Sequence, residues 1–113
     1  MREIKFRAYS YRSKRMWGWG ELENEEIGDM LKNPQEEIMQ YTGLKDKNGK
    51  EIYEGDIVKI KYRDYLGIIK WRDCGFYINE RDYAKKDFVL NITSTEEIVG
   101  NIYESPELLT EKA

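Results

Sequence analysis

The feature that most constrains the fold is a series of short segments in which polar and apolar residues alternate, most of them followed by glycine, asparagine or aspartate. The clearest case is Gly55–Trp71. One alternating run begins at Val58, and after a polar break a second one begins at Gly67. A period of two is typical of a strand with one buried face, so we predict an antiparallel hairpin. The residues of its inner face, which should begin the core, are Val58, Ile60, Tyr62, Ile69 and Trp71.

Further short strands are expected on both sides of this hairpin. Asn48-Gly49 is the strongest short signal for a tight turn, because both positions tolerate a positive φ. Strands of about five residues with a turn after each one favour a small antiparallel barrel or roll, so the predicted class is mainly β. The other expected strands are Ile4–Tyr9, Met16–Trp19, Ile38–Thr42, Glu51–Tyr53, Phe76–Ile78, Phe88–Ile92 and Ile98–Tyr103.

One short helix is expected in the N-terminal part. Asn24 is a suitable N-cap, and apolar residues follow at helical spacing as far as Leu31. Pro34 should end this helix, because it moves the preceding residue out of the α region. A single helical turn at Glu107–Leu109 is expected to close an open end of the barrel.

The residue content argues against an enzyme. The chain has no histidine, which is the commonest general base and transition-metal ligand. Its one cysteine, Cys74, lies beside Arg72 and Asp73, whose opposite charges leave no source for an activated thiolate. Asp46 begins a sequence similar to a calcium loop, but the later ligands are missing and a hairpin turn explains it. We expect no catalytic residue, cofactor or metal, with a carboxylate-only hydrolase or metal site as the remaining alternative.

The expected compartment is the cytoplasm of a bacterial host cell. No apolar run approaches the roughly 20 residues that span a bilayer, and the first residues do not form an apolar signal segment. A single cysteine cannot form an internal disulfide. We therefore expect no membrane partner.

Charge is distributed unevenly along a chain whose net charge is −3. Residues 1–20 carry six basic side chains and one acidic one, whereas residues 21–37 carry seven acidic and one basic. Two such neighbouring segments either fold against each other or steer a contact with a charged partner.

The outer face of the predicted hairpin is the candidate binding surface. Residues 59–72 contain five basic side chains and one acidic one. Three interpretations remain open: a solvated face on which lysine prevents edge-to-edge aggregation, a nucleic-acid contact, or a contact with a protein partner. The candidate residues are Lys59, Lys61, Arg63, Lys70 and Arg72.

A block of nineteen residues, Gln40–Val58, resembles the signature of the YopX family of phage and prophage proteins. The segment Ile4–Ala8 resembles the start of that family, and Ile98–Leu109 resembles its end, so the similarity spans nearly the whole chain. The family commonly has Trp-Asp where this chain has Tyr9-Ser10, an aromatic exchange that should be tolerated.

The resemblance implies a mainly β fold in two parts that fold as one unit. Residues 1–38 would form an N-terminal β-rich subdomain with the short helix and a role in self-association, and residues 39–113 a small SH3-like barrel. The resemblance supplies no activity and no site residues. We therefore expect a non-enzymatic phage or prophage accessory protein that binds a host or phage protein and forms a homo-oligomer. The alternative is nucleic-acid binding through the basic hairpin face.

Overall fold

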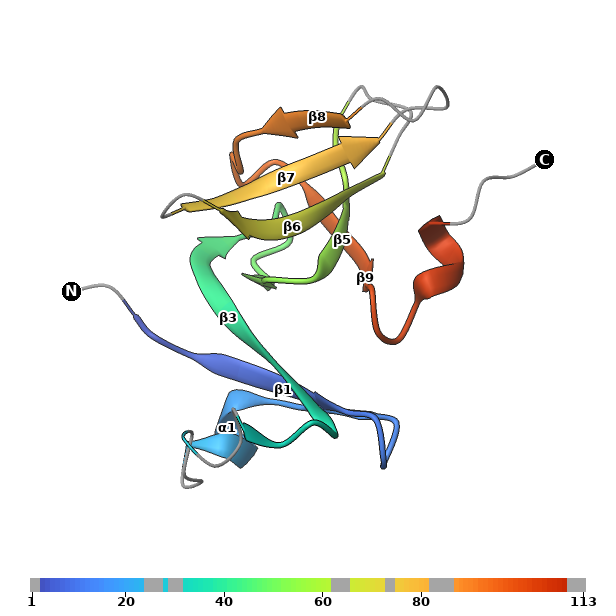
Figure 1. The fold of residues 1–113 in the computed structure, drawn as a ribbon. Helices are drawn as coiled ribbons and strands as arrows, with labels where there is room; N and C mark the ends of the chain where they lie inside the picture. The colour runs from blue at the N-terminus through green and yellow to red at the C-terminus, as the bar shows by residue number, and fades with distance from the viewer. Residues whose placement is uncertain are drawn as a thin grey trace.

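The computed structural model of the chain describes residues 3–23, 28, 32–61, 66–72, 75–81 and 87–109. Within these ranges the protein is mainly β, as predicted, and all its strand pairs are antiparallel. The strands form two sheets, one of four strands and one of five, and the five-stranded sheet curls into a half-barrel above the N-terminal strands (Figure 1).

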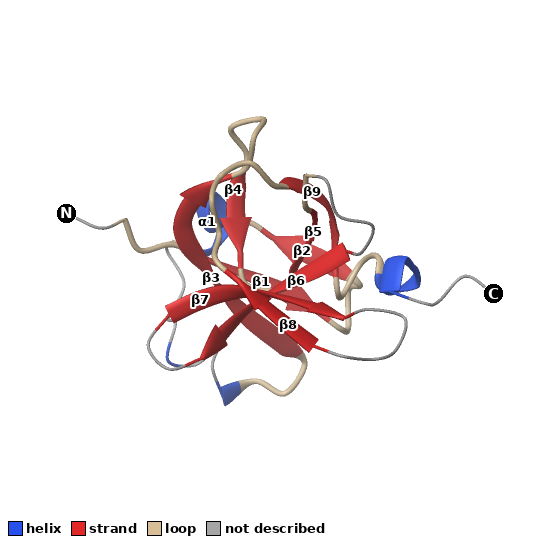
Figure 2. Ribbon diagram, turned by 90° about the horizontal axis from the view of Figure 1, so that it is seen from above, coloured by secondary structure: helices blue, strands red, loops and turns tan. Residues whose placement is uncertain are grey.

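The four-stranded sheet has the order β2-β1-β3-β4, and one long strand holds it together. Its strands are β1 (Phe6–Ser10), β2 (Arg15–Trp17), β3 (Glu36–Lys45) and β4 (Glu51–Tyr53). The first half of β3 pairs with β1 and its second half with β4, and the strand bends between them (Figures 1 and 2). The expected subdomain boundary after residue 38 falls inside β3, and the division into two parts stays a prediction.

β3 is longer than predicted because Gly43 continues the strand instead of ending it. The pairing of β3 with β4 shifts register between Tyr41 and Lys45, which is the sign of a β-bulge. Gly43 lies in this interval with a φ of +88°, a conformation that glycine adopts without steric cost. The bulge therefore carries β3 past Thr42, where the predicted strand ends, to its second partner.

The five-stranded sheet has the order β8-β7-β6-β5-β9 and contains the main core. The predicted hairpin is confirmed, since β5 pairs with β6 and places Val58 opposite Gly67. The core cluster consists of Ile52, Val58, Ile69 and Ile78, with Ile60 packed against it. The bounds of the strands are β5 (Asp56–Lys59), β6 (Leu66–Arg72), β7 (Gly75–Arg81), β8 (Asp87–Leu90) and β9 (Glu97–Asn101).

The prediction that Trp71 belongs to this core is wrong, because its side chain is 47% exposed. Trp71 lies near the end of β6, where its ring meets Phe76 edge-on at 4.8 Å between centroids. Tyr62, the remaining predicted core residue of the hairpin, lies outside the described residues.

Among the described residues, the N-terminal helix differs in position from the predicted one. The strand predicted at Met16–Trp19 ends at Trp17, and α1 (Trp19–Leu22) follows it. The side chain of Glu21 accepts a hydrogen bond from the N–H of Gly18 at 3.3 Å, which satisfies a donor at the start of the helix. The helix predicted from Asn24 to Leu31 lies outside the described residues, apart from position 28.

The C-terminal helical turn is present as η1 (Pro106–Leu109), but it does not close an end of the barrel. It lies beside β9 on the outside of the sheet (Figure 1). A side-chain carbon of Leu108 would be 2.9 Å from a Cβ added to Gly100, and Gly100 pairs with Ile57 of β5. The turn therefore covers the outer face of β9.

Gly55, in the corner between β4 and β5, joins the two sheets. Its N–H donates to the carbonyl of Ile69 at 2.9 Å, and its carbonyl accepts from the N–H of Ile102 at 3.0 Å. Its φ is +88°, and a Cβ at this position would lie 3.3 Å from the sulfur of Met39. Glycine at this corner therefore lets β3, β6 and the segment after β9 approach one another.

Asp46 fastens the β3–β4 hairpin to β9. One carboxylate oxygen accepts from the N–H groups of Asn48 and Lys50, both at 2.9 Å, and the other accepts from Ile98 at 3.0 Å. Burial alone would raise the pKa of Asp46, but these three donors outweigh it and hold the pKa below its usual value. The hairpin turn predicted at Asp46 thus also connects two sheets.

We expect Asp46→Asn to lower the free energy of unfolding by about 2 kcal/mol at neutral pH, since the new amide group turns a donor towards the N–H of Ile98. The depressed pKa means that ionised Asp46 stabilises the fold above about pH 4 and that this contribution is lost as the pH falls further. The difference between the two proteins in urea denaturation should therefore shrink in acid. Lys47→Gln, in the same turn, is the control, and a difference independent of pH would contradict the assignment.

No helix among the residues that the structure describes is long and apolar enough to cross a membrane.

Candidate binding cleft

The predicted basic face of the β5–β6 hairpin is divided by apolar residues. Lys59 pairs with Leu66, so it shares a sheet face with Lys70, and both lysines are exposed. Lys70 is four residues along β6 from Leu66, a separation of about 13 Å. Ile57, which is fully buried, and the half-buried Ile68 form the pair that lies between the two lysines.

The remaining residues of the predicted face are only partly described. Lys61 is exposed and follows the end of β5, so it lies at the same end as Lys59. Arg63 lies outside the described residues, and of Arg72 only the backbone, paired with Gly75, is described. The structure thus brings Lys59 and Lys61 together and separates them from Lys70. Binding at this face stays a prediction.

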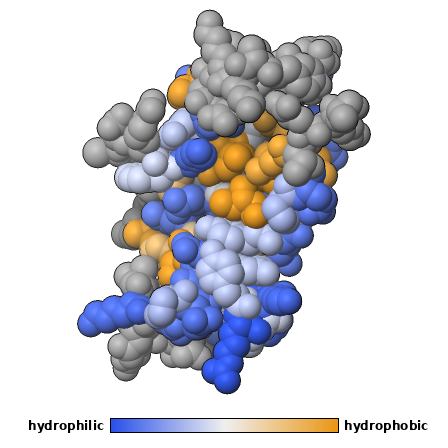
Figure 3. Space-filling view, turned by 45° about the vertical axis from the view of Figure 1, so that its right-hand side comes forward, coloured by the Kyte–Doolittle hydropathy of each residue, from blue (hydrophilic) through white to orange (hydrophobic). Residues whose placement is uncertain are grey.

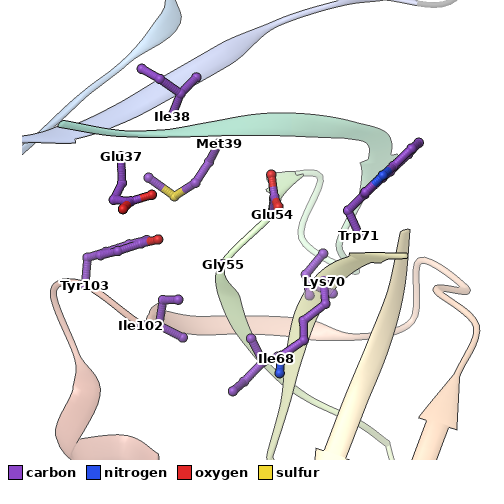
Figure 4. Close-up of a pocket in the computed structure, with 11 residues that line it drawn as sticks. Glu37, Ile38, Met39, Glu54, Gly55, Ile68, Lys70, Trp71, Ile102 and Tyr103 are labelled. Carbon is purple, nitrogen blue, oxygen red and sulfur yellow. The ribbon is translucent and has the colours of Figure 1, made fainter. Parts of the chain in front are cut away.

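A cavity of about 260 Å³, here called the junction cleft, lies between β3 and β6 (Figure 4). It is built by segments far apart in the sequence: β3, the corner between β4 and β5, β6, and the turn after β9. In Figure 4 Glu37 and Met39 lie on the cleft side of β3, whereas Ile38 points to the opposite side. The residues that line the cleft are Glu37, Ile38, Met39, Glu54, Gly55, Ile68, Ile69, Lys70, Trp71, Ile102 and Tyr103.

Two carboxylates give the junction cleft its acidic character. Within the described part of the chain neither Glu37 nor Glu54 forms an ion pair, and the carboxylate of Glu54 accepts only a long hydrogen bond of 3.5 Å from the N–H of Gln40. The ammonium group of Lys70 is the one cation of the lining, and Figure 4 shows its side chain extending along β6 past Ile68, away from Glu54.

Tyr103, which lines the cleft, belongs to a cluster of three tyrosine rings. Tyr103 stacks on Tyr9 with ring centroids 5.4 Å apart, and Tyr11 meets Tyr9 edge-on at the same distance. Burial and then the nearby Glu37 raise the pKa of Tyr103 to about 12, and the same two causes raise the pKa of Tyr11. Only the contribution of Glu37 to these shifts reflects negative charge at the Glu37 end of the cleft.

A buried ion pair fixes the corner that carries Glu54. Arg7 of β1 and Asp56 of β5 are 2.7 Å apart, with side chains 13% and 2% exposed. Burial raises the pKa of Asp56, and Arg7 and a hydrogen bond of 2.8 Å from the N–H of Tyr53 oppose the increase. Arg7 also lies over the Tyr53 ring, 4.9 Å from its centroid. The two charges cancel, so this pair adds no net charge to the cleft.

The YopX protein family matches residues 5–110, which is nearly the whole chain and agrees with the resemblance of the Gln40–Val58 block. The chain belongs to the YopX family. A solved structure, protein EF1440 from Enterococcus faecalis, is similar to it with a TM-score of 0.64 and 26% identity over 97% of this chain and 100% of that one. No curated protein matches. Neither the family description nor the name of the Enterococcus protein states an activity.

The signature block of this YopX family member is largely structural. It contains Asp46, Gly55 and Asp56, which hold the hairpin, the corner and the buried ion pair described above. Of the charged residues that line the junction cleft, it supplies only Glu54. The block therefore maintains the seam between the sheets, and most of the cleft is lined by residues outside it.

The sequence did not predict that the residues lining the cleft lie close together. The acidic run 21–37 is a signal for Glu37, but no local pattern connects that residue with Trp71 or Tyr103. Within the described ranges no three histidine, cysteine, aspartate or glutamate side chains are close enough to hold a metal ion. The chemistry that the junction cleft offers is recognition by charge, aromatic rings and apolar contact.

A second surface feature consists of exposed apolar side chains on β9 and η1. Val99 of β9 and Leu108 and Leu109 of η1 are 39%, 38% and 41% exposed. In the view of Figure 3, which brings the side of β9 and η1 forward, apolar side chains gather in the upper centre and hydrophilic ones dominate below. This surface lies outside the junction cleft.

Proposed function

We propose that this YopX family member is a non-catalytic phage or prophage accessory protein that binds a partner protein in the junction cleft. The observation that carries the proposal is that one concave site combines the half-exposed ring of Trp71 with two carboxylates, Glu37 and Glu54, that form no ion pair among the described residues. Concave sites with aromatic anchors and a few polar groups are typical of recognition surfaces.

The titratable groups of the cleft support a non-catalytic role. They are two glutamates, one lysine and one tyrosine, and the sequence has no histidine to act as a general base. The same proposal places the protein in the cytoplasm of a bacterial host and treats the curled sheet as an SH3-like barrel.

Self-association through the N-terminal part is the second element of the proposal. β2 (Arg15–Trp17) is at the edge of the four-stranded sheet, where it pairs on one side with β1. An edge strand offers backbone groups to another chain. Sedimentation velocity over a range of concentrations tests this element: a homo-oligomer is expected, and a monomer at high concentration would contradict it.

Affinity purification from phage-infected or prophage-bearing cells tests partner binding at the cleft. We expect the wild-type protein and the control Glu23→Gln to recover the same host or phage protein. Glu37→Gln combined with Glu54→Gln should recover it at least tenfold less, because both carboxylates of the cleft lose their charge.

Equal recovery by the cleft variant would contradict the proposal. Nucleic acid that is recovered with the wild-type protein, is released by salt and is not recovered with Lys59→Glu would instead support the alternative of nucleic-acid binding. Binding driven by phosphate contacts falls steeply with salt. The Glu23→Gln control removes one carboxylate from an exposed position just after α1, so it reports the effect of losing a negative charge outside the site.

A further inference from the structure

We propose that the junction cleft receives an arginine side chain from an extended segment of the partner protein. This inference rests on the proposed function and adds the chemistry of the group that is recognised. It is carried by charge complementarity, because the cleft presents to an incoming cation two carboxylates that form no ion pair with any described residue.

The charges around the cleft leave an unbalanced negative site. Arg7 lies close to the corner, but its charge is matched by Asp56 at 2.7 Å. Lys70 extends along β6 and away from Glu54 in Figure 4. The lining as a whole therefore has two negative charges and one positive charge, and the two carboxylates, Glu37 and Glu54, lie on the β3 side.

The size and lining of the cleft suit a single long side chain. A volume of about 260 Å³ is below the roughly 300–1,000 Å³ that is typical of sites for larger organic ligands. Met39, Ile68 and Ile102 provide apolar contact for a chain of methylene groups. Arginine buries such a stem against apolar surface while its charged end remains at a polar site.

Arginine fits better than lysine because of the aromatic rings. Trp71 is 47% exposed, and the ring of Tyr103 also lines the cleft. A planar guanidinium stacks on such rings and binds a carboxylate through two hydrogen bonds, which a compact ammonium group cannot do.

The same chain already uses this arrangement internally. Arg7 lies over the Tyr53 ring and pairs with Asp56, and Arg15 lies over the Trp17 ring, 4.0 Å from its centroid, and pairs with Glu21. In both cases a guanidinium is held between a ring and a carboxylate. The lining of the junction cleft likewise contains aromatic rings and carboxylates, and it contains no arginine.

The tyrosine pKa values agree with this assignment. Glu37 follows burial as a cause of the raised pKa of both Tyr103 and Tyr11. The part of each shift that comes from Glu37 reflects a negative charge at the Glu37 end of the cleft, and that charge favours a bound cation.

The test is a titration of the full-length, ¹⁵N-labelled protein with capped pentapeptides in NMR. The probes carry arginine, citrulline or glutamate at the central position of an otherwise identical Ala/Gly sequence. Citrulline has nearly the shape of arginine without its charge. We expect the arginine peptide to shift the Trp71 indole and the amides of Gly55 and Tyr103, and to bind at least fivefold more tightly than the citrulline peptide.

The protein variants supply the controls. Glu37→Gln combined with Glu54→Gln should reduce arginine binding to the level of citrulline, Glu23→Gln should leave it unchanged, and Lys70→Gln should strengthen it because the one cation of the lining is removed. Equal binding of arginine and citrulline peptides, or shifts confined to other surfaces, would overturn the inference. A loss of self-association in the double variant would also overturn it, by assigning the cleft to a second copy of this chain.

Failure of the inference and failure of the proposed function are distinguishable. If the cleft variant loses its partner in the purification but the peptides show no preference for arginine, partner binding stands and the assignment of arginine is wrong. If arginine binds selectively but the partner is retained by the cleft variant, the site is real and the proposed function is wrong.

Discussion

Replacing Arg7 with methionine should lower the free energy of unfolding by about 3 kcal/mol at neutral pH. Removing one partner of a buried ion pair leaves the other charge without compensation, and the Asp56 side chain is only 2% exposed. Methionine keeps apolar contact with the Tyr53 ring but cannot donate to Asp56 or to the carbonyl of Glu54. Urea denaturation followed by circular dichroism measures the loss.

The loss should depend on pH. Burial raises the pKa of Asp56, and without Arg7 the opposing cation is gone. A carboxyl whose folded pKa lies above its unfolded value of about 3.9 contributes stability fully only below that value, and this contribution is lost as the pH rises through the folded pKa. The deficit of Arg7→Met should therefore be smallest near about pH 4 and increase towards pH 7.

Two variants control this experiment. Adding Asp56→Asn to Arg7→Met should restore much of the stability and remove the pH dependence, because the buried charge is gone and the amide oxygen still accepts from the N–H of Tyr53. Lys5→Met removes a cation from the segment just before β1 whose partners, Glu3 and Glu51, are more exposed, and should have a smaller effect. A deficit equal at all pH values would show that Asp56 does not carry the effect.

The alternation in the sequence is sufficient to predict the strands whose pairing is local. β4 has the predicted bounds Glu51–Tyr53, and the antiparallel pairing of β5 with β6 follows from the repeats around Val58 and Gly67. A strand with one buried face shows its period in its own residues, so a single sequence contains the information.

The elements that differ from the predictions depend on contacts outside their own segment. Gly43 reads as the end of a strand, but the second partner of β3 makes it a bulge. Trp71 continues the apolar alternation of β6, yet it lies where that strand leaves the core. Trp19 reads as strand, and the hydrogen bond from Gly18 to the side chain of Glu21 favours a helical turn instead.

The candidate site shows the same limit. The basic residues Lys59 and Lys70 are correctly predicted to share a sheet face, but the pairing that buries Ile57 between them is not visible in a period of two. The junction cleft depends on where β3 crosses β6, which no local pattern specifies. The one sequence signal for a residue of this cleft is charge, because the acidic segment 21–37 ends at Glu37.

Gly67→Ala should lower the free energy of unfolding by about 3 kcal/mol, because its methyl group has no space in the core. A Cβ at Gly67 would lie 2.3 Å from Cγ2 of Ile78 and 3.4 Å from Cδ1 of Ile60. Ile78 is 1% exposed and held in β7, so it cannot move aside without disturbing the sheet. Thermal denaturation should show a decrease in Tm of roughly 10 °C. Gly75→Ala, in the same sheet but with nothing within 4 Å of the new methyl group, should change Tm little.

A double-mutant cycle identifies the clash as the cause. Ile78→Ala alone should cost about 3 kcal/mol through the cavity that it leaves. When it is combined with Gly67→Ala, the same change removes the clashing Cγ2 atom, and the new methyl group fills part of the cavity. The double variant should therefore lose about 1–2 kcal/mol less free energy of unfolding than the sum of the losses in the two single variants. Additive losses would mean that Gly67 acts through its backbone conformation and not through close packing against Ile78.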